Sequence, residues 1–99
     1  MQITDNTCRN NGKKNAILTL AKCDGVLLRN NVFCNDSGRG AVVYSEFSDA
    51  YTRNIVFEQN RYANGGSKND TCFVYLGKKY RSFEKWKKAV GRKAGTYLE

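Results

Sequence analysis

The sequence predicts an all-β solenoid, a fold in which short strands of successive repeats stack on one another. The main evidence is a phrase that occurs three times, in residues 3–12, 28–37 and 57–66. Each copy runs from an apolar residue through two polar residues to an asparagine, and then toward a turn. These asparagines are Asn6, Asn31 and Asn60, so their spacings are 25 and 29 residues. A repeat of about 20–50 residues is typical of solenoids, whose units bury their apolar faces only by stacking.

A second repeat is interleaved with the first and indicates strands rather than helices. It occupies residues 16–20, 41–45 and 72–76, which are rich in Val, Leu, Phe and Tyr. Short runs of this composition, bounded by Asn, Asp and Gly, are typical of strands. The residues alone therefore give two strand-forming runs in each repeat. A leucine-rich repeat would need a helical return segment, and β-branched and aromatic residues stand in that place.

Two strand-forming runs with aligned asparagines resemble the right-handed parallel β-helix family, also called the pectate-lyase-like superfamily. The resemblance implies about three coils, each of three short strands, with equivalent residues stacked in ladders. Coils about 4.8 Å apart would let Asn6, Asn31 and Asn60 pass side-chain hydrogen bonds along the stack. Asparagine also tolerates the left-handed backbone conformation that a sharp corner between strands requires.

The last part of the chain predicts a cap on the final coil. We divide the single domain into coils at residues 1–77 and a basic capping helix with its tail at residues 78–99. The helix is expected from Ser82, a good N-cap, to Val90, with Gly91 as its stop. The phrase from Tyr80 to Gly91 resembles the closing segment of β-helix proteins from bacterial polysaccharide-degrading systems. Residues 92–96 depart from that family's continuation, which usually contains an aspartate.

The start of the chain predicts an open end. Met1 aligns with Val26 and Ile55, so the chain begins inside a strand with no preceding cap. We expect this end to be covered by upstream coils of a longer parent, or by a second copy in a homodimer joined through the first coil. No apolar run is long enough to cross a membrane. The sequence leaves the cellular location open, and the resemblance suggests a secreted or cell-surface parent.

The positive charge is concentrated near the end of the chain. The sequence has 17 basic and 9 acidic residues, a net charge of +8. Residues 78–93 contain eight of the basic residues and a single acid, Glu84. This segment could attract an acidic polysaccharide, or it could be a solvated face that keeps the end of the solenoid soluble. We favour the solvated face, and we do not expect nucleic acid as a partner.

The cysteines do not indicate a metal site, and we expect no metal and no cofactor. The chain has no histidine and no CxxC spacing. Cys8 takes the position of Phe33 in the next repeat, and Cys72 takes that of Ala41, so both are interpreted as small core residues. The sequence leaves open whether disulfides form among the four cysteines, which are Cys8, Cys23, Cys34 and Cys72.

Aromatic residues provide a candidate carbohydrate site. Alternation along the strands would place Tyr44 and Tyr75 in one outward column and Phe73 in a second outward column. Such columns could stack on sugar rings, with Lys78 and Lys79 nearby to attract an acidic sugar. The alternative is that a loop or a second chain covers this apolar stripe.

The candidates for catalysis are weak. Without histidine, serine–histidine and cysteine–histidine mechanisms are excluded. A carboxylate pair would be needed for glycoside hydrolysis, and the candidates are Asp24 with Asp49, and Glu46, Glu58 and Arg29. Repeated aspartates are more often turn formers. We therefore expect a structural, assembly or carbohydrate-binding segment of a polysaccharide-acting protein. The alternative is a small polysaccharide lyase or glycoside hydrolase that acts on acidic polysaccharide.

Overall fold

The chain is mostly β structure with one short α-helix, as the sequence predicted. The computed structural model describes residues 1–10, 16–35, 41–45, 51–65 and 72–98. Its strands are β1 (Gln2–Thr4), β2 (Thr7–Asn10), β3 (Leu18–Leu20), β4 (Asp24–Arg29), β5 (Val32–Asn35), β6 (Val43–Ser45), β7 (Arg53–Glu58), β8 (Asn60–Ala63), β9 (Phe73–Tyr75), β10 (Lys78–Tyr80) and β11 (Gly95–Tyr97). The helices are α1 (Phe83–Val90) and the 3₁₀-helix η1 (Arg92–Ala94).

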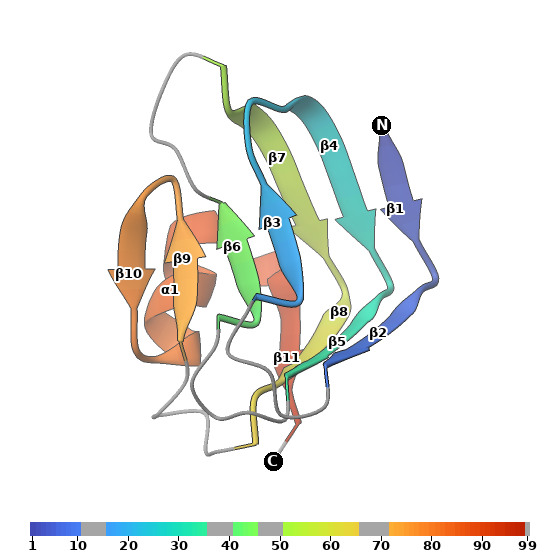
Figure 1. The fold of residues 1–99 in the computed structure, drawn as a ribbon, viewed down its shortest axis with the longest axis vertical. Helices are drawn as coiled ribbons and strands as arrows, with labels where there is room; N and C mark the ends of the chain where they lie inside the picture. Colours follow the sequence, from blue (N-terminus) through green and yellow to red (C-terminus); the bar gives the residue numbers. More distant parts are fainter. Residues whose placement is uncertain (11–15, 36–40, 46–50, 66–71, 99) are drawn as a thin grey trace.

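Strands from successive repeats lie side by side in three sheets (Figure 1). The strand orders are β1-β4-β7, β2-β5-β8-β11 and β3-β6-β9-β10. All pairs are parallel except β9 with β10. The register follows the sequence repeat, because Ile3 lies opposite Leu28 and Leu28 lies opposite Phe57. The prediction of parallel pairing between repeats is confirmed.

Each asparagine phrase turns a corner between two sheets and therefore contributes two strands. The residue before each aligned asparagine has a left-handed backbone, with φ of 58° at Asp5, 56° at Asn30 and 51° at Gln59. The corner therefore takes the left-handed conformation that the sequence analysis expected, at the residue before each aligned asparagine. With the corner included, each repeat holds three strands, where the residues alone had indicated two.

Apolar side chains stack in columns inside the three sheets. Leu28 and Phe57 are almost completely buried at paired positions of β4 and β7. In the next sheet the rings of Phe33 and Tyr62 stack with their centroids 5.8 Å apart. A strand buried on its inner face stabilises the fold by about 25 cal/mol for each Å² of apolar surface removed from water. The strand register therefore places equivalent residues of successive repeats above one another in the core.

The helix α1 closes one end of this core. It begins one residue after Ser82, as predicted, although the Ser82 side chain makes no capping hydrogen bond. Trp86 is fully buried and stacks on Phe73 with the ring centroids 4.5 Å apart. Its ring also meets Tyr62 edge-on at 5.1 Å. The apolar face of α1 therefore seals the last repeat with a cluster of aromatic rings.

The C-terminal segment adds two strands that the sequence did not predict. Leu76 and Gly77, with φ of 51° and 82°, turn the chain so that β10 returns antiparallel to β9. Two consecutive left-handed residues are typical of the tightest hairpin turns. Further on, β11 pairs in parallel with β8. Residues 78–98 are therefore a hairpin strand, two helices and an edge strand, rather than a helix and a tail.

Gly95 should be needed for the close contact between β11 and β8. A side chain there would overlap the backbone oxygen of Asn60, whereas one at Gly91 would meet nothing within 4 Å. The two glycines have nearly equal φ values, 130° and 127°. Gly91→Ala therefore controls for backbone strain. We expect Gly95→Ala to lower the free energy of unfolding by about 1–3 kcal/mol more than Gly91→Ala.

Urea denaturation of the two variants measures this difference. Equal losses of stability would mean that β11 does not pack on Asn60 in solution.

Candidate functional site

The N-terminal end of the stack is the strongest candidate site, and a ladder of asparagines leads to it. The backbone N–H and the Nδ2 of Asn31 both donate to Oδ1 of Asn60, at 2.9 and 3.1 Å. Asn6 donates in the same two ways to Oδ1 of Asn31, at 3.0 and 3.2 Å. Asn31 and Asn60 are each 1% exposed. The structure thus brings the three predicted ladder residues into one continuous chain of hydrogen bonds.

The ladder has a direction. In Asn31 and Asn60, Oδ1 accepts hydrogen bonds from the preceding repeat. The Nδ2 of each also donates to a carbonyl of the preceding repeat, that of Ile3 at 2.8 Å and that of Leu28 at 3.0 Å. At Asn6 the same Nδ2 turns instead to Thr4 of its own repeat, at 2.9 Å. Within the described residues, Oδ1 of Asn6 receives no donor from a preceding repeat.

The strands of the first repeat form one edge of all three sheets. In the order of each sheet, β1, β2 and β3 have a described neighbour on one side only. Figure 1 shows β1 and β2 at one end of the stack and α1 and β10 at the other. Ile3 and Cys8 are only half-buried, although their partners Leu28 and Phe33 are completely buried. Among the described residues, this end presents unpaired strand edges and part of the apolar core.

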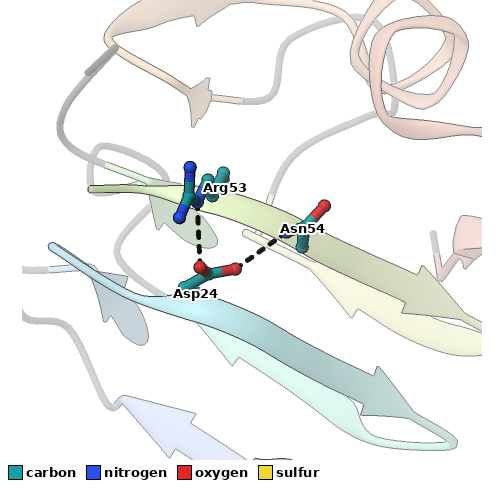
Figure 2. Close-up of polar contacts among 3 residues, drawn as sticks. All are labelled: Asp24, Arg53 and Asn54. Atoms are coloured by element: carbon teal, nitrogen blue, oxygen red, sulfur yellow. Dashed lines mark hydrogen bonds and ion pairs between the residues drawn. The ribbon is translucent and has the colours of Figure 1, made fainter. Parts of the chain in front are cut away.

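Asp24 is held in a polar cluster on the outside of the first sheet (Figure 2). It lies opposite Arg53 on β7 and accepts a hydrogen bond from the Arg53 Nε at 2.8 Å. Its other oxygen accepts from Nδ2 of Asn54, also at 2.8 Å. The hydrogen bond from Asn54, and then that from Arg53, lower the pKa of the Asp24 carboxyl.

This cluster does not suit catalysis by a proton donor. A general acid needs a carboxyl with a raised pKa, and the pKa of Asp24 is shifted the other way. Asp24 and Arg53 are 47% and 62% exposed in their side chains, so their ion pair is screened by water and adds little stability. The aspartate is best described as a link between two strands.

The other catalytic candidates do not form a carboxylate pair within the described residues. Glu46 and Asp49 lie outside those residues, so the expected stacking of Asp49 on Asp24 is not described. Arg29 and Glu58 occupy paired positions of β4 and β7, as the repeat predicted. Arg29 also lines a polar depression of about 410 Å³, with Gln2, Thr4, Asp5, Asn30 and Gln59. Asp5 is the one acid in that lining, and its carboxylate accepts from Asn30 at 2.6 Å.

The aromatic column proposed for sugar binding does not form. Phe73 is completely buried, because α1 packs on β9 and Trp86 covers its ring. Tyr44 lies opposite Val74, one residue away from the expected Tyr75. A shift of one residue moves a side chain to the other face of a strand. Tyr75 is accordingly half-buried and meets the core ring of Phe57 edge-on at 6.3 Å.

Lys78 and Lys79 belong to the hairpin strand β10 rather than to the capping helix. Both are exposed, and the Lys78 Nζ lies 5.4 Å from the centre of the Tyr80 ring. Because Phe73 and Tyr75 face the core, these lysines do not flank an exposed aromatic platform. Burial and the neighbouring Tyr80 raise the pKa of the Tyr75 hydroxyl.

The four cysteines are free thiols, each half-buried. Cys8 pairs with Phe33, the equivalent position of the next repeat. The described residues contain no cluster of three or more acids, cysteines or histidines that could hold a metal ion. Within the same residues, no helix is long and apolar enough to span a membrane.

Two depressions bring together residues that the sequence analysis had not placed in one site. One, of about 500 Å³, is lined by Lys22, Asp24, Tyr51 and Arg53. The other, of about 480 Å³, lies at the closed end and is lined by residues of β8, α1, η1 and β11. No local signal marks either one, because their members are distant in sequence and meet only when the repeats stack.

Comparisons with protein-family models, with curated proteins and with solved structures found no match. The function must therefore be argued from the geometry of the chain itself. The directional ladder and the open edge at its start are the features that carry such an argument.

Substitutions along the ladder should have unequal costs. Asn31→Ala removes a buried side chain with partners in both neighbouring repeats. It leaves the backbone N–H of Asn6 without its acceptor and removes the donation from Nδ2 to Oδ1 of Asn60, which keeps only the backbone N–H of residue 31. We expect it to lower the free energy of unfolding by about 1–3 kcal/mol. Asn6 is exposed, and its partners lie in its own repeat and the following one, so Asn6→Ala should cost less. Denaturant titrations compare the two variants, and equal costs would show that the ladder does not form in solution.

Proposed function

We propose that this chain is a structural segment of a right-handed parallel β-helix protein. Its N-terminal end receives another coil, and its C-terminal end is closed by its own cap. The observation that carries the proposal is Asn6, whose Oδ1 lacks the donor that Asn31 and Asn60 each receive from a preceding repeat. A coil that continued the stack would supply that donor.

Several features support the β-helix assignment. Strands of successive repeats pair in parallel in all three sheets, and each repeat turns at a left-handed residue before the ladder asparagine. The helix α1 lies across the last repeat, where the resemblance to polysaccharide-acting β-helix proteins placed it. The assignment of a polysaccharide-acting parent comes from that resemblance.

The direction of the ladder favours upstream coils over a homodimer. A coil running in the same direction would present a backbone N–H to Oδ1 of Asn6. A second copy related by a two-fold axis would present another Asn6, and two Oδ1 acceptors would then face each other. That pairing leaves acceptors unsatisfied, which costs free energy. A homodimer is the alternative for the isolated chain, since it would cover Ile3 and Cys8.

An enzymatic function has less support. Asp24 is tied to Arg53 and Asn54 with a lowered pKa. Arg29 and Glu58 lie side by side, but the adjoining depression has Asp5 as its single acid. A lyase or glycosidase acting on acidic polysaccharide remains an alternative for a longer parent rather than for this segment.

Extending the chain tests the proposal. A second copy of residues 1–25 placed before Met1 should raise the free energy of unfolding, because the native Asn6 becomes an interior member of the ladder. In the extended chain, Asn6→Ala should then cost about 1–3 kcal/mol, as expected for Asn31→Ala. A scrambled extension of the same composition is the control. If Asn6→Ala cost the same with and without the extension, the open end would not be a site for a further coil.

The isolated chain should self-associate through the same end at high micromolar concentration. Ile3→Lys places a charge in the exposed part of the core and should abolish the association. Val56→Lys is the matched control, because Val56 is 46% exposed on the outer face of β7. Sedimentation equilibrium measures both variants. A strictly monomeric wild-type chain, or equal effects of the two lysines, would exclude the homodimer and leave upstream coils as the partner.

A further inference from the structure

Four basic residues line one depression at the closed end of the stack. The depression has a volume of about 480 Å³. Its basic residues come from three elements, Arg61 from β8, Lys87 from α1, and Arg92 and Lys93 from η1. The remaining lining residues are Gln59, Asn60, Gly95 and Thr96. No acid lines the depression, so all the charged residues of its described lining are basic.

The backbone that carries these cations is firmly fixed. The N–H of Gln59 donates to the carbonyl of Lys93 at 2.6 Å, which ties η1 to the corner before β8. The buried hydroxyl of Tyr62 donates to the carbonyl of Ala94 at 2.8 Å. Thr96 pairs with Arg61 in the parallel register of β11 and β8. The elements that carry the basic side chains are therefore held together before any ligand binds, and no rearrangement of the backbone is needed.

The electrostatics of the depression favour an anion. Arg61, Arg92 and Lys93 are exposed, whereas Lys87 is half-buried with its Nζ 5.9 Å from the centre of the Phe83 ring. Like charges held around one space repel one another, and an anionic ligand would relieve that repulsion. Guanidinium groups also bind carboxylate and sulfate in a bidentate geometry. We propose that this depression binds an acidic polysaccharide through its carboxylate or sulfate groups.

The uncharged lining favours a saccharide over a nucleic acid. Gln59 and Thr96 offer an amide and a hydroxyl, which can hydrogen-bond to sugar hydroxyls. No aromatic side chain lines the depression, and recognition of single-stranded nucleic acid depends on stacking of bases on aromatic rings. The volume lies in the range of small-ligand sites. The proposed site shares no residue with the column of Tyr44 and Tyr75 that the sequence had suggested.

A paired set of variants tests the site. Arg61→Gln with Arg92→Gln removes two charges from the depression. Lys85→Gln with Lys88→Gln removes the same charge from exposed positions of α1 outside the lining. Calorimetric titration with an oligouronate and with a sulfated oligosaccharide should show binding to the wild-type chain. We expect the arginine pair to weaken binding about tenfold or more, and the lysine pair to leave it within about twofold.

Two further ligands complete the test. A neutral oligosaccharide of equal length should not bind, and single-stranded DNA should bind more weakly than the acidic saccharides at the same salt concentration. Equal losses in the two double variants would mean that net charge alone attracts the ligand and would overturn the proposal. It would also be overturned by tighter binding of DNA, by equal binding of the neutral sugar, or by no binding of either acidic saccharide.

Discussion

The asparagine ladder is the interaction on which the rest of the fold depends. At each corner the chain leaves one sheet and enters the next, so backbone groups there have no regular strand partner. The N–H of Asn31 is satisfied by Oδ1 of Asn60, and the N–H of Asn6 by Oδ1 of Asn31. These bonds fix one repeat on the next in a single register. The apolar columns, such as Leu28 on Phe57, follow from that register, since a slip of one residue would turn them outward.

The sequence predicted the parts of the fold that repeat. Three copies of one phrase were enough to place Ile3, Leu28 and Phe57 in one column and to predict parallel strands. The helix from Phe83 to Val90 was also predictable, because its apolar spacing is a local signal. The strands β10 and β11 were not, since nothing earlier in the chain repeats them. The expected pairing of Tyr44 with Tyr75 was wrong for a related reason. The spacing between the second and third copies is longer, at 29 residues, and aligning the sequences across it gave a strand register that is one residue off.

The candidate site was predicted in part. The ladder residues could be found from the repeat, because Asn6, Asn31 and Asn60 occupy the same position in its three copies. The direction of the ladder could not be predicted from the repeat, because it depends on which amide atom of Asn31 faces which neighbouring repeat. The depression lined by basic residues could not be predicted, because its members are far apart in the sequence. Arg61 lies about 30 residues before Arg92, and the sequence therefore placed the positive charge on a single cap segment rather than around one space.

The two ends of the stack differ because of what occupies the ladder position. In the parallel register, the residue of β11 opposite Asn60 is Gly95. Glycine has no Oδ1 to accept from Asn60, and its backbone lies so close that no side chain would fit. The ladder therefore cannot continue beyond Asn60. At the other end Asn6 keeps an acceptor, and the strand edges of β1, β2 and β3 have no described neighbour. The two ends of the described stack therefore differ in the residue at the ladder position, an asparagine in the first repeat and a glycine after the last.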